Sequence, residues 1–138
     1  TRQYTPHERF GLLEWVCMES PYKDKLGLVA IDGIADLLGS VNDQETSNKI
    51  VQALLSWTKI RNFHLNTVIH KNHGTAKPTG HPAPSIKKKA ETVAFVENYG
   101  DSVEVTPDYT RNFGFQKFSF YIDENGFPRE KETAKDPF

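Results

Sequence analysis

Two apolar runs that each lead into polar residues constrain the fold of this chain more than any other feature. The first run spans residues 26–32 and ends on Asp32, and the second spans residues 65–73 and turns polar at His70. Each begins like a buried strand, and a stretch with helical periodicity separates them. Strand, helix and strand in this order predict a right-handed βαβ unit. The chain is therefore expected to have an α/β fold.

Both runs place polar side chains where a strand ends. Parallel α/β sheets bind ligands at the carboxyl ends of their strands, so Asp32 and His70 are expected at one sheet edge. A carboxylate there can hold the water shell of Mg²⁺, and Asp36 offers a second carboxylate. The structural alternatives are a turn or cap role for Asp32, a surface charge at Asp36 and a backbone hydrogen bond for His70.

The polar cluster continues beyond His70 into a stretch rich in glycine and proline. Lys71, Asn72 and His73 follow directly, and residues 74–84 contain two glycines and three prolines, which predicts a mobile loop. A zinc site formed by His70, His73 and His81 is an alternative, although the chain has no second cysteine to complete it. A small hydrolase or metal enzyme that uses Asp32, His70 and His73 is another.

Periodicity and turn residues predict the remaining elements. Proline and capping residues predict helices over 6–20 and 45–62. A helical turn is expected over 85–90, strands over 91–97, 103–106 and 118–123, a turn over 124–128, and a flexible tail over 129–138.

Composition narrows the class of protein. The chain has 138 residues, a net charge of −1 and a pI near 6.5, which argue against a strongly basic nucleic-acid module. Its single cysteine, Cys17, is expected to be a buried free thiol. No apolar run has the length of a membrane span and no signal peptide is visible, so no membrane contact and a cytoplasmic location are expected.

Basic side chains in the second half are candidates for phosphate contacts. Lys87, Lys88 and Lys89 follow the Gly/Pro-rich stretch and, with Lys77 inside it, could contact nucleic-acid phosphates, although such a run is more often a solvated helix face. Arg111 and Lys117 flank the last expected strands, and an arginine there could reach a nucleotide on a neighbouring subunit.

The order and spacing of three segments resemble a known family. These are VAIDGIADL (residues 29–37), VIHKN (68–72) and GHPAPSIKKKAET (80–92). Together they resemble the second half of a RecA-like P-loop ATPase of the hexameric replicative-helicase and plasmid RepA type. The ATPases of bacterial mobilizable transposons and plasmids are especially similar. The likeness extends from about Pro6 to Pro128.

The resemblance implies a fold and site roles. The fold would be a three-layer RecA-like half over residues 1–128, with a mostly parallel sheet and antiparallel strands at its C-terminal end. Asp32 would be the Walker B carboxylate that holds Mg²⁺ through water, and His70 would be the sensor of the γ-phosphate. The DNA-facing loop would span residues 72–85, and Arg111 would reach across a subunit interface. Glu8 or Glu14 could approach the catalytic base position.

The same resemblance implies partners for a longer parent protein. These would be ATP with Mg²⁺, DNA, and further copies of the chain in a ring or filament, in the bacterial cytoplasm. The family's phosphate loop, Gly-x-x-x-x-Gly-Lys-Ser/Thr, does not occur in this chain. The chain is therefore expected to be an inactive fragment that binds no nucleotide itself, with the missing half before Thr1.

Two further expectations concern self-association and the DNA-facing loop. An uncovered sheet edge would favour self-association of the fragment, for example as a dimer. Pro82, Ala83 and Pro84 stand where the family pattern favours glycine and would stiffen the DNA-facing loop. The alternative is a non-catalytic module that keeps a RecA-type sheet and binds DNA or a protein through Lys87 to Lys89, Arg111 and Lys117.

Overall fold

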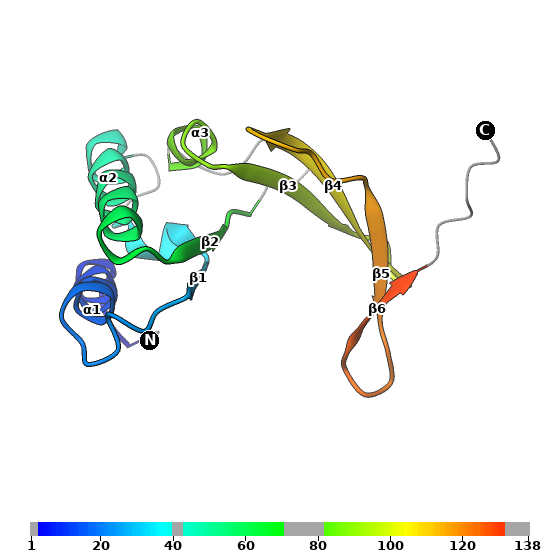
Figure 1. Ribbon diagram of the computed structural model, residues 1–138, viewed down its shortest axis with the longest axis horizontal. Helices are drawn as coiled ribbons and strands as arrows, with labels where there is room; N and C mark the ends of the chain where they lie inside the picture. Colours follow the sequence, from blue (N-terminus) through cyan, green and yellow to red (C-terminus); the bar gives the residue numbers. More distant parts are fainter. Residues whose placement is uncertain (1–2, 40–42, 71–81, 132–138) are drawn as a thin grey trace. The chain divides into compact units, whose positions relative to one another are not determined.

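The computed structural model describes residues 3–39, 43–70 and 82–131, and the chain divides into two compact units, Thr1–Lys88 and Lys89–Phe138 (Figure 1). The elements of the first unit are α1 (Pro6–Met18), β1 (Leu28–Asp32), the 3₁₀ helix η1 (Ile34–Leu37), α2 (Gln44–Arg61), β2 (His64–Val68) and α3 (Pro82–Lys87). Those of the second are β3 (Thr92–Asn98), β4 (Val103–Thr110), β5 (Phe118–Ile122) and β6 (Pro128–Lys131).

The strand–helix–strand unit predicted from the two apolar runs is present. Strands β1 and β2 pair in parallel, with Leu28 opposite His64 and Asp32 opposite Val68. Helix α2 connects them, and it begins and ends within one residue of the predicted bounds. The α/β assignment is therefore confirmed for the first unit.

Local signals at both ends of α2 explain where it starts and stops. The Asp43 side chain accepts a hydrogen bond from the Thr46 backbone N–H at 3.0 Å, which satisfies one of the free donors of the first turn. At the other end Asn62 adopts the left-handed conformation, with φ of 54°, that commonly ends a helix. Helix α1 begins with a capping box between Thr5 and Glu8.

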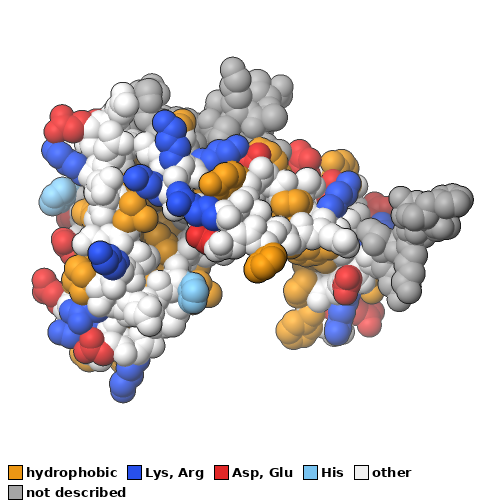
Figure 2. All heavy atoms as spheres, turned by 45° about the horizontal axis from the view of Figure 1, so that its top comes forward, with side chains coloured by type: hydrophobic (Ala, Val, Ile, Leu, Met, Phe, Trp, Pro, Cys, Tyr) orange, Lys and Arg blue, Asp and Glu red, His pale blue; other side chains and the backbone are white. Residues whose placement is uncertain are grey.

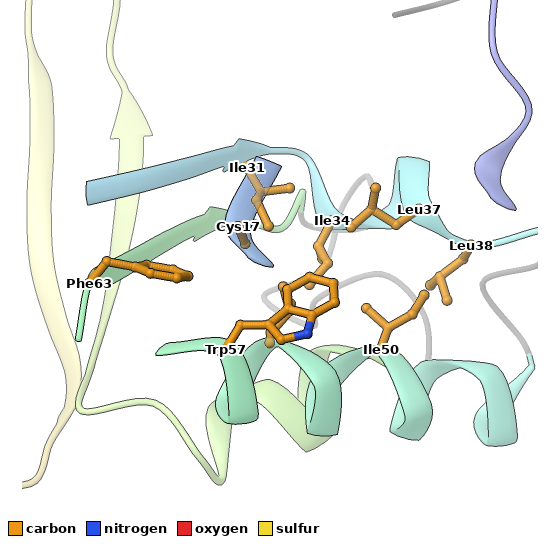
Figure 3. Close-up of a cluster of buried hydrophobic side chains, with 9 residues drawn as sticks. Cys17, Ile31, Ile34, Leu37, Leu38, Ile50, Trp57 and Phe63 are labelled. Atoms are coloured by element: carbon orange, nitrogen blue, oxygen red, sulfur yellow. The ribbon is translucent and has the colours of Figure 1, made fainter. Parts of the chain in front are cut away.

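The core of the first unit lies between α1, α2 and the parallel strands. Figure 3 shows Trp57 and Ile50 of α2 pointing toward Ile31 and Ile34. Cys17 lies in the same cluster and is only 1% exposed, so the predicted buried thiol is confirmed, and burial raises its pKa. This packing covers one face of the parallel strand pair.

The prediction of a mostly parallel sheet is wrong. Strands β3 to β6 form a separate four-stranded antiparallel sheet in sequence order, and among the described strands only β1 and β2 are parallel. The physical reason is the length of the connections, because short turns can join only antiparallel neighbours. Gly100 and Gly126, with φ of 90° and 82°, lie in two of these turns.

Two boundaries differ from the sequence-based expectation. Helix α3 begins at Pro82, inside the stretch predicted to be a loop, because proline is compatible with the first turn of a helix. Residues 129–131, assigned above to the flexible tail, belong to β6, while residues 132–138 lie outside the described part of the chain.

The antiparallel sheet has faces of opposite character. The cross-strand register places Val96, Val105 and Phe118 on one face and Glu97, Glu104 and Ser119 on the other. Val105 is buried, but Val96 is 60% exposed. One face of this sheet is therefore apolar without being covered within its own unit.

Two neighbouring leucines of α2 provide a matched test of the core. Leu54 is 4% exposed and Leu55 is 36% exposed. We expect Leu54→Ala to lower the free energy of unfolding by about 2–5 kcal/mol, because it leaves a cavity beside Trp57. Leu55→Ala should cost less than about 1 kcal/mol. Urea unfolding followed by tryptophan fluorescence measures both, and equal losses would contradict this description of the core.

The cap of α2 predicts an acid-dependent contribution to stability. Hydrogen bonds from the Thr46 side chain and backbone lower the pKa of Asp43 below its ordinary value. A lowered folded-state pKa stabilises the fold above the unfolded-state pKa, and this contribution is lost as the pH falls through the folded-state value. Asp43→Asn keeps a capping group that does not titrate. The variant should therefore lose less stability than the wild type in acid, and identical acid unfolding curves would contradict the prediction.

Candidate functional site

The carboxyl ends of β1 and β2 form the candidate site. Asp32 is the last residue of β1, and His70 follows two residues after Val68, the residue paired with Asp32. Both side chains are exposed. Among the described residues no basic side chain forms an ion pair with Asp32. The structure therefore places an unpaired carboxylate and an imidazole at the same edge of a parallel strand pair.

Gly33 brings the two strand ends into contact. A methyl group added to Gly33 would lie 3.5 Å from the Val68 carbonyl oxygen and 3.8 Å from both Cδ2 and Nε2 of His70. The imidazole therefore lies against the backbone directly after Asp32. The sequence placed Asp32 and His70 at one sheet edge but indicated no role for Gly33. The signal that could have indicated this close approach is a glycine directly after a strand-ending aspartate.

The alternation of β1 explains why Asp32 faces outward. Ile31 is buried in the core, and its neighbours on the strand point to the opposite face. Thr67 of β2 donates a side-chain hydrogen bond to the Ile31 carbonyl at 3.3 Å, beside the Asp32 position. The direction of the carboxylate thus follows from strand geometry and core packing.

Asp36 has a structural partner. It lies in η1, its carboxylate is 3.8 Å from the Arg9 guanidinium, and its carbonyl accepts a 3.1 Å hydrogen bond from the same group. These contacts connect η1 to α1. A role for Asp36 in metal binding remains a prediction.

The two glutamates considered for the base position differ in their surroundings. Glu8 belongs to the capping box of α1, where hydrogen bonds from Thr5 lower its pKa. A carboxylate held in this way is a weak base, and its hydrogen bonds are already used by the cap. Glu14 is exposed on α1.

The candidate nucleic-acid contacts are only partly described. Lys87 and Lys88 are exposed at the end of α3, which the hydrogen bond between Ser85 and Asn48 connects to α2 at 3.0 Å. The other candidates, Lys71, Asn72, His73, Lys77 and His81, lie outside the described residues. Their predicted roles are therefore untested. The zinc alternative is untested as well, because two of its three histidines, His73 and His81, are among these residues.

Arg111 belongs to the second unit, where backbone groups hold it. Its N–H donates to the Glu91 carbonyl at 2.9 Å, and its Nε donates to the Ala90 carbonyl at 3.0 Å. Lys117 forms a 2.7 Å ion pair with Glu104, which raises the pKa of the lysine. The ion pair makes Lys117 less available for the binding-module alternative.

The surface has a mixed character. Lys and Arg side chains lie among acidic and hydrophobic ones on the face shown in Figure 2. Within residues 3–39, 43–70 and 82–131, no cluster of three or more His, Cys, Asp or Glu side chains could hold a metal ion. None of the helices described here is long and apolar enough to cross a membrane.

No family model matches the chain, and neither does any curated protein.

Adding a methyl group at Gly33 tests the contact with His70. We expect Gly33→Ala to fold, since 3.5–3.8 Å is ordinary van der Waals contact, and to shift the ring-proton NMR signals of His70. Gly27→Ala is the control, because nothing lies within 4 Å of its added carbon. Unchanged His70 signals in Gly33→Ala would contradict this geometry.

Proposed function

We propose that this chain is the C-terminal half of a three-layer, RecA-like ATPase of the replicative-helicase and plasmid RepA type, from a bacterial mobile element. The longer parent protein would use ATP hydrolysis to do work on DNA. One observation carries the proposal: an exposed, unpaired Asp32 and the imidazole of His70 lie at the same carboxyl edge of a parallel strand–helix–strand unit. Ligands bind at such an edge in α/β proteins.

The incompleteness of the parallel pair also supports the proposal. The residues of its outer face are exposed, Leu28 to 62% and Val68 to 42%. Parallel sheets occur almost only with both faces covered. The half that carries the phosphate loop would supply strands and helices that cover this outer face.

The chain's own residues fit a defined part of the chemistry. Magnesium prefers carboxylate and water oxygens, so Asp32 can hold it through a bound water. Bound beside ATP, the ion would neutralise charge on the transferring phosphoryl group. His70 can donate a hydrogen bond to a γ-phosphate oxygen and so distinguish ATP from the hydrolysed product. Without a phosphate loop, the chain alone would not hydrolyse ATP.

The DNA and subunit contacts belong to the same proposal. Exposed Lys87 and Lys88 offer charge to DNA phosphates near the end of the proposed DNA-facing loop. Arg111 would reach the nucleotide of a neighbouring subunit, as an arginine finger does. Both contacts would operate in a ring or filament of the parent protein.

The proposal is tested on the protein expressed with the natural coding sequence that precedes Thr1. Asp32→Asn should lower kcat for ATP hydrolysis about a hundredfold or more, with a smaller change in KM, because its charge acts mainly in the transition state. His70→Ala should also lower kcat. Glu19→Gln, an exposed position at the end of α1, should change neither parameter.

The contrary results are equally definite. An upstream sequence without a Gly-rich loop, or hydrolysis that Asp32→Asn leaves unchanged, would overturn the ATPase proposal. A non-catalytic DNA- or protein-binding module would then be the better account.

A further inference from the structure

Helix α1 has apolar side chains on its solvent side as well as on its core side. On the core side Phe10 stacks on Trp57, with ring centroids 5.3 Å apart, and Cys17 is buried. On the other side Leu12 is 41% exposed and Trp15 is 48% exposed. A surface helix normally has one apolar stripe and a polar opposite face, whereas a helix that is apolar all round is normally covered. Helix α1 therefore presents a second apolar face that remains open to solvent.

The shape of this face suits the close approach of another helix. Leu12 and Trp15 are three residues apart, so their side chains adjoin on the helix surface. One turn before Trp15, a carbon added to Gly11 would meet nothing within 4 Å. The helix surface beside the indole is therefore open. Tryptophan is also among the residues that contribute most to binding at protein interfaces.

The charge around the two apolar side chains is acidic. Helix α1 contains no lysine, and its one arginine, Arg9, engages Asp36. Glu14 is exposed next to Trp15 and forms no ion pair among the described residues. The last turn carries no basic side chain, and Glu19 follows at the C-cap. The C-terminal end of a helix is already its negative pole, so a cation from outside the chain would be stabilising there.

Helix α2 shows the more usual arrangement within the same unit. Its last turn carries Lys59 and Arg61, whose charges complement the negative pole of the helix. The acidic end of α1 is therefore a property of this helix and not of the helices of the chain in general.

We propose that the outer face of α1, formed by Gly11, Leu12, Glu14 and Trp15, binds a basic amphipathic helix of a partner protein. The apolar stripe of the partner covers Leu12 and Trp15. Its lysine or arginine side chains face Glu14 and the C-terminal end of α1. An amphipathic helix that lays its apolar stripe on an apolar surface is a recurring mode of recognition, and the charges around the contact select the partner.

Other occupants fit this face less well. Nucleic acids and anionic lipid surfaces carry negative phosphates, which the acidic side chains of α1 repel. A second copy of α1 would bring the acidic side chains of two helices together, and like charges across an interface are unfavourable. A basic helix matches both the apolar side chains and the charge.

Fluorescence titration of the 138-residue chain with a synthetic peptide tests the proposal. The probe is an amidated helix of repeated Leu-Lys-Lys-Leu-Leu-Lys-Lys heptads, and the same peptide with glutamate in place of lysine is the charge control. Trp57 is only 5% exposed, so Trp15 is the tryptophan that reports on the solvent side of α1. We expect the lysine peptide to shift the emission to shorter wavelength and the glutamate peptide to leave it unchanged.

Matched variants locate the binding face, with binding followed by the fluorescence anisotropy of the labelled lysine peptide. Trp15→Ala should raise the dissociation constant at least about tenfold. Glu14→Lys should raise it at least about threefold. Ile60→Ala and Glu124→Lys are the controls, because both residues are exposed on other elements, Ile60 to 58%. Each control should leave the dissociation constant within about twofold.

The proposal fails if the lysine peptide causes no emission shift, if both peptides bind equally, or if Trp15→Ala and Ile60→Ala have equal effects. Sedimentation equilibrium tests the remaining occupant, because self-association that Trp15→Ala abolishes would assign this face to a second copy instead. The titration needs no nucleotide, so its outcome is independent of the proposed ATPase activity.

Discussion

The packing of α2 on the parallel strands is the constraint on which the candidate site depends. Ile50, Leu54 and Trp57 form the buried stripe of the helix, and they cover the inner side of β1 and β2 (Figure 3). With Ile31 fixed in this core, strand alternation turns Asp32 to the outer face. The parallel register then aligns the strand ends, and the position of the site follows from hydrophobic packing.

The two units differ in how much of their apolar surface they bury alone. Within the described residues of the first unit, nine buried side chains form one hydrophobic cluster, whereas β3 to β6 contribute one buried hydrophobic side chain, Val105. An antiparallel sheet can expose one face to water, but that face is normally the polar one. Here Val96 and Ile122 remain exposed on the apolar face.

The sequence predicted some features well because their signals are local. The predicted bounds of α1 and α2 lie close to the observed ones. Capping residues such as Thr5 and Asp43 marked where the helices start, and helical periodicity with the turns that follow marked where they end. The strand-ending Asp32 and the following His70 were placed at one edge because parallel strands share their direction. The pairing of β3 was predicted poorly, since strand propensity does not specify which partner a strand takes or in which direction.

What the sequence alone determined is the type and order of the elements as far as β5, the βαβ connection and the residues at its carboxyl edge, because periodicity, caps and turn residues act over a few positions. Only the tertiary structure decided that the sheet divides in two, that Gly33 lies against His70, that Arg9 engages Asp36, and that Phe113 is left uncovered. Each of these depends on contacts between distant segments, and such contacts are fixed by packing rather than by local preference.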